Sequence, residues 1–192
     1  LGHEQVVFCH NKDVGLKAII AVHNTTLGPA LGGLRMWPYK SEQEALNDVL
    51  RLSRGMTFKA AVAGLNLGGG KGVIIGDPSK DKSEGLFRAF GRFVNSLGGR
   101  YITAEDVGID VNDMEYVFKE TDYVSGVHQV HGGSGDPSPF TAAGSLQGMM
   151  ASLNVRFGTE DIGKFSYAVQ GVGHVGYELA KLLRAEKAKV FV

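Results

Sequence analysis

Two lysines are candidates for chemistry because they are the only charged residues in a stretch of small and apolar ones. The stretch runs from Met56 to Ile75, MTFKAAVAGLNLGGGKGVII, and its lysines are Lys59 and Lys71. A solvated surface would mix lysines with carboxylates and other polar groups, whereas residues 60–65 are small or apolar. We therefore expect both ammonium groups to face a cleft with an apolar lining, which would suit an anionic small molecule.

The glycines around Lys71 indicate a place where a ligand reaches the backbone. Residues 68–70 and Gly72 have no Cβ atom, which leaves room for a ligand and permits positive φ. Residues 73–75 predict a buried strand that holds Lys71 at its edge. Burial and a second ammonium group would lower the pKa of this lysine, so that it could exchange protons near neutral pH. The alternative is a flexible glycine loop with solvated lysines. A phosphate-binding P-loop is excluded, because Gly72 follows the lysine where Ser or Thr is required.

A carboxylate at the end of a predicted strand is the third candidate. Residues 101–103 predict a short strand that runs into Ala104-Glu105-Asp106-Val107-Gly108. Such positions carry catalytic side chains in many α/β enzymes, although an aspartate considered by itself, as Asp106 is here, is more often a turn or helix-cap residue. His128 and His131 are close enough in sequence for a metal pair, but no further ligand cluster accompanies them, so no metal site is predicted.

The elements that must position these side chains predict an α/β protein. Residues 5–10 and 16–23 predict two strands joined as a hairpin. Ser41 and Glu44 form an S-x-x-E capping box before a helix whose apolar face runs to Met56. Further helices are predicted over residues 84–97 and from Asn112 or Asp113 to Phe118. A glycine-rich loop is predicted over residues 26–38, which include Gly32, Gly33 and Arg35.

Composition places the chain among ordinary globular proteins. Its 192 residues are 43% hydrophobic, enough to bury a core. Twenty basic residues balance 20 acidic ones, so no overall field attracts nucleic acid or an anionic membrane. No apolar run approaches the ~20 residues of a membrane span, and no signal peptide opens the sequence. The single cysteine, Cys9, fits a reducing compartment. We expect a cytoplasmic protein without nucleic-acid or membrane partners.

The last part of the chain predicts the beginning of a dinucleotide-binding fold. Residues 165–170 predict a strand, GVGHVG over residues 171–176 matches G-x-G-x-x-G, a helix extends to about Ala185, and residues 189–192 begin another strand. In this context the glycines bring a pyrophosphate to a helix N-terminus. The acidic residue that would read the ribose is not among the residues present, so the motif does not choose between NAD and NADP. A helix from Thr141 to about Leu153 is predicted to link two domains.

Five segments, in chain order, carry a resemblance to a known family: GLKAIIAVHNTTLGPALGGLRMW, FKAAVAGLNLGGGKGVIIGDP, RYITAEDVG, ETDYVSG and GSGDPSP. Together they resemble the glutamate/leucine/phenylalanine/valine dehydrogenase superfamily, and within it the leucine-specific branch. The resemblance implies an N-terminal α/β substrate-binding and oligomerisation domain with a mixed sheet over residues 1–140. It implies a linking helix and the first β-α-β of an incomplete Rossmann NAD-binding domain over residues 141–192.

The activity that the resemblance implies is that of an oxidoreductase. It is the reversible, NAD-dependent oxidative deamination of a branched-chain or other apolar L-amino acid, leucine first, to the 2-oxo acid and ammonia. The enzyme is expected to be a homo-oligomer. Leu34 stands where leucine-specific members commonly have Thr, and Ser125 replaces a pocket Thr, so the preferred amino acid stays open.

The resemblance also implies roles for individual residues. Lys71 would act on a bound water and stabilise the developing oxyanion, and Asp106 would relay protons to and from the amine. Lys59 would hold the substrate carboxylate, helped by the backbone around Gly32 and Gly33. Leu31, Met56 and Ala104 would line the pocket for the substrate side chain. Thr141 would reach toward the nicotinamide. The dinucleotide itself would be bound by the glycine turn and its neighbours, Gly171, Val172, Gly173, His174, Val175, Gly176 and Tyr177.

Three alternatives remain open at the level of sequence. The first is a phenylalanine or valine dehydrogenase of the same family, and the second is a truncated, non-catalytic assembly or ligand-binding module derived from such an enzyme. The third is a hydroxy-acid dehydrogenase, which would want a histidine base in place of the lysine pair. We expect residues 1–192 by themselves not to complete hydride transfer.

Overall fold

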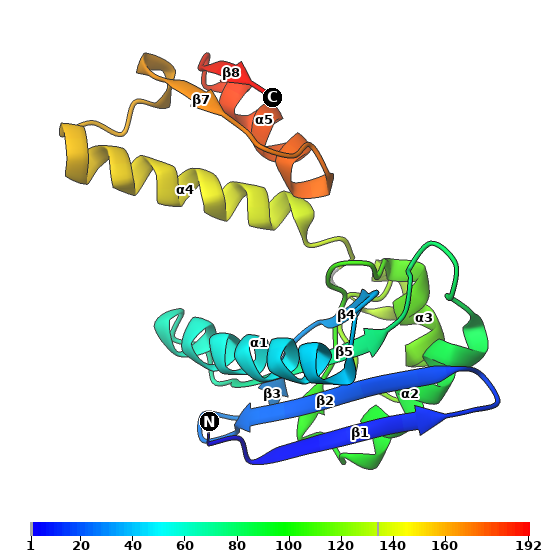
Figure 1. Cartoon of the computed structure of the whole chain (residues 1–192). Helices are drawn as coiled ribbons and strands as arrows, with labels where there is room; N and C mark the ends of the chain where they lie inside the picture. Colours follow the sequence, from blue (N-terminus) through cyan, green and yellow to red (C-terminus); the bar gives the residue numbers. More distant parts are fainter. Residues whose placement is uncertain (1, 134) are drawn as a thin grey trace. The chain divides into compact units, whose positions relative to one another are not determined.

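The computed structural model describes residues 2–133 and 135–192, which form two compact units (Figure 1). The first unit ends at Gly135 and the second begins at Asp136. The first contains a mixed sheet with packed helices, and the second contains a pair of parallel strands with its own helices. The α/β class predicted from the sequence is confirmed. Among the helices of the described ranges, none is long and apolar enough to cross a membrane.

The sheet of the first unit begins with the predicted hairpin. Strands β1 (Gln5–Asn11) and β2 (Leu16–Asn24) are antiparallel, and β2 is also antiparallel to β5 (Gly68–Ile75). On its other side, β5 pairs in parallel with β3 (Ala30–Leu31) and β4 (Leu34–Trp37). Strand β5, which carries Lys71, therefore lies in the interior of the sheet.

Strands β3 and β4 correct the prediction of a plain loop over residues 26–38. Both strands run alongside β5 and are separated only by Gly32 and Gly33. Strand β6 (Tyr101–Ile102) extends the sheet in parallel beyond β3. The glycines suggested a loop because glycine is common in turns, but Ala30, Leu34 and Met36 are fully buried and anchor the segment in the sheet.

Helices cover the two faces of this sheet, and the alternation of side chains along β5 separates two cores. Val73 packs with residues of α1 (Glu42–Val62), whereas Ile74 packs with residues of α2 (Glu84–Ser96) and α3 (Val111–Phe118). Lys71 has the same parity as Val73, so its side chain lies on the face covered by α1. This arrangement places the lysine between the sheet and a helix.

The glycines of β5 are strand residues, so the strand predicted over residues 73–75 begins earlier, at Gly68, and the alternative of a flexible glycine loop is wrong. None of Gly68, Gly69, Gly70 and Gly72 has positive φ. Their role is close packing: a Cβ on Gly69 would lie 2.1 Å from the Thr57 amide nitrogen of α1, and one on Gly70 would lie 2.6 Å from the Tyr101 ring. The absent side chains therefore let α1 and Tyr101 approach the strand.

The N-termini of α1 and α3 are capped by polar side chains, as predicted, but the capping residues differ from the prediction in two details. The Ser41 hydroxyl accepts from the Glu44 amide at 3.1 Å, as predicted, but the Glu44 carboxylate accepts from the Lys40 amide and not from Ser41. The cap of α3 is Asp110, two or three residues earlier than predicted. Its carboxylate accepts from the amide of Asp113, whose own carboxylate accepts from the Asp110 amide, and this reciprocal box fixes the earlier start.

The second unit contains the predicted strand, helix and strand. Strands β7 (Ser166–Ala168) and β8 (Lys189–Phe191) are parallel, and α5 (His174–Ala185) connects them. Helix α4 (Ser138–Phe157) packs on α5, and the buried core of this unit consists of Leu146, Leu153, Ile162, Leu183 and Ala188. It starts three residues before the predicted Thr141, because a proline is tolerated in the first turn of a helix.

Candidate active site

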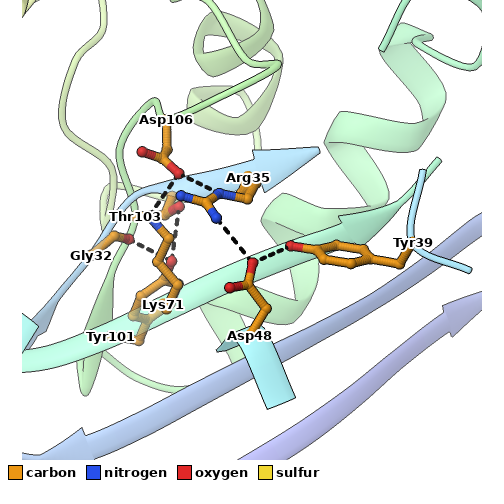
Figure 2. Close-up of polar contacts among 8 residues, drawn as sticks. All are labelled: Gly32, Arg35, Tyr39, Asp48, Lys71, Tyr101, Thr103 and Asp106. Carbon is orange, nitrogen blue, oxygen red and sulfur yellow. Dashed lines mark hydrogen bonds and ion pairs between the residues drawn. The ribbon is translucent and has the colours of Figure 1, made fainter. Parts of the chain in front are cut away.

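Lys71 and Asp106 form an ion pair in the first unit, although they are far apart in sequence. The Lys71 Nζ lies 2.9 Å from the Asp106 Oδ2 (Figure 2). Only 6% of the lysine side chain is exposed, against 27% of the aspartate side chain. The lysine side chain is thus almost fully buried, while part of the aspartate side chain is exposed.

Two glycines bring the carboxylate to the lysine. Leu34, at the start of β4, forms a parallel bridge with Glu105, the residue before Asp106. The segment that follows β6 therefore runs beside the start of β4. A Cβ on Gly33 would lie 2.9 Å from the Cβ of Asp106, so any larger residue would push the aspartate away. Gly32 must be as small, because its Cβ would lie 1.6 Å from the Gly70 carbonyl oxygen. The break between β3 and β4 therefore makes space for the pair.

Arg35, Asp48 and Tyr39 extend the ion pair into a connected network (Figure 2). The Arg35 Nε donates to the same Asp106 oxygen as Lys71, at 2.9 Å, and its Nη1 donates to the Asp48 Oδ2, also at 2.9 Å. The Tyr39 hydroxyl donates to that Asp48 oxygen at 2.6 Å. The sequence reasoning missed this network. The available signal was an arginine between buried Leu34 and Met36, where an unpaired charge would be costly.

The pKa of Lys71 lies below its ordinary value, because burial disfavours the charged ammonium more than the charge of Asp106 favours it. Arg35 lowers the pKa further, and Asp48 opposes this effect. Burial raises the pKa of Asp106, but the charge of Lys71 and the hydrogen bonds from Lys71 and Arg35 outweigh it, so the net pKa of Asp106 is lowered. The aspartate stays ionised while the lysine is brought closer to neutral pH.

Replacing the aspartate is expected to lower the pKa of Lys71 further. In Asp106→Asn the favourable charge is lost, while burial and Arg35 continue to disfavour the ammonium. We expect a fall of at least about one pH unit, measured by NMR titration of the lysine Nζ or Cε signal. Asp77→Asn, which removes a half-buried carboxylate that forms an ion pair with Lys80 and accepts from Ser79, should leave the Lys71 titration unchanged. An unchanged titration in Asp106→Asn would contradict the pairing.

An open hollow of about 780 Å³ lies beside the network. Arg35, Tyr39 and Asp48 line it together with Trp37, Asn47 and Arg51. The side chains of Arg35, Tyr39 and Asp48 are therefore open to solvent on the side of this hollow.

Lys59 lies in the last turn of α1 and is exposed, with no ion pair among the described residues. The expectation of an enclosed apolar lining is wrong within this unit, because Val62 is 90% exposed and Leu65 is 48% exposed. Helix α1 ends at Val62, and in its last turn Ala60 is buried whereas Val62 points away from the core. Leu65 follows the end of the helix. Lys59 as the carboxylate ligand stays a prediction.

The other predicted substrate residues lie close to the Lys71 strand. Leu31, Met56 and Ala104 are half-buried. The Gly32 amide donates to the Ile102 carbonyl at 3.1 Å, and its own carbonyl accepts from the Tyr101 hydroxyl at 2.6 Å. Both backbone groups of Gly32 are thus engaged within the sheet.

Leu34 does not belong with these predicted pocket residues. It is fully buried on the opposite face of the sheet from Lys71, among the core residues that pack on α2. Its difference from the leucine-specific pattern is therefore a core substitution.

The second unit fits a dinucleotide at its glycine turn. Gly171 has φ of 91°, which favours glycine, and a Cβ on Gly176 would lie 2.1 Å from the Gly171 carbonyl oxygen. Gly173 caps α5 without a side-chain hydrogen bond and has open space where a Cβ would be. The first amides of α5 are therefore available to phosphate oxygens. Val172, His174 and Tyr177 are exposed around this turn, and Val175 is half-buried.

Thr141, predicted near the nicotinamide, is exposed in the first turn of α4, where its hydroxyl donates to the Pro137 carbonyl at 3.0 Å.

His131 lies 3.4 Å from a Glu115 carboxylate oxygen, and the His128 amide donates to Glu115. Within residues 2–133 and 135–192, no group of three or more His, Cys, Asp or Glu side chains could hold a metal ion.

Comparison with known proteins gives a consistent set of relatives. The family model "Glu/Leu/Phe/Val dehydrogenase, dimerisation domain" matches residues 3–123. The chain is 61% identical to a leucine dehydrogenase of Geobacillus stearothermophilus and 57% identical to a phenylalanine dehydrogenase of Bacillus thermotolerans, each over 190 residues. These matches cover 99% of this chain but 52% and 50% of those relatives, so the chain spans about half their length.

A solved structure agrees with these relatives. The L-tryptophan dehydrogenase from Nostoc punctiforme superposes with a TM-score of 0.73 at 46% identity, over 100% of this chain and 54% of that one. The family model covers more than half of the chain and includes Arg35, Asp48, Lys71 and Asp106. On this evidence the chain belongs to the Glu/Leu/Phe/Val dehydrogenase family.

Proposed function

We propose that the protein is an amino-acid dehydrogenase that oxidatively deaminates an apolar L-amino acid, with leucine the first candidate, to its 2-oxo acid and ammonia. The observation that carries this proposal is the buried Lys71 side chain with its ammonium 2.9 Å from Asp106, in a chain that is 61% identical to a leucine dehydrogenase over 190 residues. Because the chain spans about half of that relative, the proposal concerns the polypeptide that completes it.

The chemistry of the proposed reaction needs a proton acceptor and a stabilised oxygen. NAD, held by the Gly171–Gly176 turn, would supply the hydride acceptor. Once the amine-bearing carbon is an iminium, a water oxygen adds to it, and the neutral Lys71 amine takes the proton that this water loses. The resulting ammonium passes this proton through Asp106 to the amine nitrogen, and Lys71 becomes neutral again. As the carbonyl forms and ammonia leaves, Lys71 takes the second proton from the hydroxyl group and stabilises the negative charge that develops on its oxygen.

Substrate recognition is proposed on the same face of the sheet. Lys59 would hold the substrate carboxylate, and the backbone at Gly32 and Gly33 would allow the substrate to approach closely. Leu31, Met56 and Ala104 would contact its side chain, because an apolar side chain needs a lining without charge.

Assembly and location complete the proposal. The matched domain is described as a dimerisation domain, which supports a homo-oligomer. A cytoplasmic location is proposed because an NAD-coupled reaction requires the cellular pool of this cofactor. The choice of NAD over NADP is likewise part of the proposal.

A second candidate is a phenylalanine dehydrogenase, which the 57% identity to the Bacillus thermotolerans enzyme favours. Reduction of NAD by the complete polypeptide that carries this chain should be measured with L-leucine, L-valine, L-phenylalanine and L-glutamate. We expect the highest kcat/KM with leucine and the lowest with glutamate. A preference for phenylalanine would select the second candidate, and no turnover with any of the four would reject the proposed class. Binding of NAD, measured by calorimetry, would separate an enzyme from a non-catalytic module.

A further inference from the structure

We propose that Arg35 and Asp48 are positioning residues that set the proton affinity and the orientation of the Lys71–Asp106 pair. This inference rests on the proposed function for its kinetic consequence, but its structural part can be tested without turnover. The sequence assigned no role to either residue, and both come from elements on the Lys71 face: Arg35 from β4 and Asp48 from α1 (Figure 2).

The geometry shows one carboxylate oxygen shared between two cations. The Asp106 Oδ2 lies 2.9 Å from both the Lys71 Nζ and the Arg35 Nε. A carboxylate accepts several hydrogen bonds, but the direction of two donors fixes its plane. Arg35 therefore holds the aspartate in the orientation that faces the lysine, and it does so from the solvent side, since 23% of its side chain is exposed against 6% for Lys71.

Arg35 is itself held by a second carboxylate. Its Nη1 lies 2.9 Å from the Asp48 Oδ2, and that oxygen also accepts from the Tyr39 hydroxyl at 2.6 Å. The planar guanidinium presents donors in a fixed fork, which allows one side chain to bridge two carboxylates on different elements. A lysine in this position has a single nitrogen and could not hold both in the same way.

The four charges alternate along the network: Lys71, Asp106, Arg35 and Asp48 carry one positive, one negative, one positive and one negative charge. The hydroxyl of Tyr39 donates to Asp48 and adds no charge to the network. Without Asp48, one of the two carboxylates that offset the positive charge of Arg35 would be lost, and that charge would disfavour the ammonium form of Lys71 more strongly. Asp48 thus limits how far the proton affinity of the lysine falls.

The first test measures the charge effect on the 192-residue chain. In Asp48→Asn, a side chain of nearly the same shape loses its charge. We expect the pKa of Lys71 to fall by about 0.5 to 1 unit, followed by NMR. The matched control is Glu42→Gln, which removes a carboxylate from the exposed first turn of the same helix and should shift the titration by less than ~0.2 unit. Equal shifts in the two variants, or none in Asp48→Asn, would overturn the proposal.

The second test measures orientation in the complete polypeptide. Arg35→Lys keeps the charge but loses the fork, and we expect kcat to fall at least about tenfold with KM changed less than about threefold, because the aspartate is misoriented. In Asp48→Asn, the pH at which kcat/KM levels off should become lower, because the Lys71 pKa is expected to fall. A fall in melting temperature without either kinetic change would indicate a purely structural ion pair and reject the proposal. If the unsubstituted polypeptide turns over no amino acid, the proposed function fails, while the NMR test still decides the positioning role.

Discussion

Lys71→Ala is expected to reduce kcat of the complete polypeptide by at least about a thousandfold. The variant loses the proposed proton acceptor and the cation that would stabilise the oxygen of the adding water. The fold should survive, because Asp106 keeps its contact with Arg35 at 2.9 Å and is not left as an unpaired charge. The measurement is steady-state NAD reduction, with circular dichroism to confirm the fold.

The pH profile gives this prediction a direction. Lys71 must be neutral to accept a proton, so kcat/KM should rise with pH and level off above the Lys71 pKa, which lies below the ordinary lysine value. The pKa of Asp106 is also lowered, so the aspartate stays ionised across this range. Residual activity of Lys71→Ala should lack the rising limb.

Two other lysines serve as controls for Lys71→Ala. Lys80→Ala changes an exposed lysine that pairs with Asp77, and it should leave kcat within about twofold. Lys59→Ala should mainly raise KM if this residue holds the substrate carboxylate. A Lys71→Ala enzyme with kcat close to that of the unsubstituted enzyme would remove the basis of the proposed mechanism.

Gly32→Ala should destabilise the first unit by about 3 to 5 kcal/mol or prevent its folding. The new Cβ would lie 1.6 Å from the Gly70 carbonyl oxygen, and the nearby backbone belongs to the interior strand β5. The atoms that the new Cβ would meet are backbone atoms of Gly70 and Lys71, which cannot move aside as a flexible side chain can. Removing the clash would require separating β3 from β5. Urea unfolding of the chain, followed by circular dichroism, measures the loss of stability.

Gly55→Ala is the matched control for this substitution. Gly55 is exposed within α1, and no atom lies within 4 Å of the Cβ that alanine would add. Alanine is the better helix former, so this variant should gain roughly 0.5–1 kcal/mol. Similar stability of the two alanine variants would show that the close contact between Gly32 and β5 does not constrain the fold.

Some of the site could be predicted from sequence because its signals are local. Lys71 among glycines, Asp106 after a short strand, and the strand–turn–helix context of residues 171–176 are all patterns within about twenty neighbouring residues. Hydrophobic alternation also located the hairpin and the main helices, since periodicity depends only on which face is buried.

The same local reasoning failed where glycine has two meanings. The glycines of β5 and the pair Gly32 and Gly33 suggested loops, but in the structure they are the points where backbones touch. A sequence pattern records that a side chain is absent, and only the neighbouring element shows why it must be absent.

The sequence by itself therefore determined the family resemblance, the fold class and the two groups proposed for the chemistry. Only the tertiary structure decided that Lys71 and Asp106 lie 2.9 Å apart, that Arg35 and Asp48 join them, and that Lys59 is exposed on α1. These contacts depend on the order of the strands in the sheet and on which helix covers each face. Both are set by packing between segments distant in the chain, which no local pattern encodes.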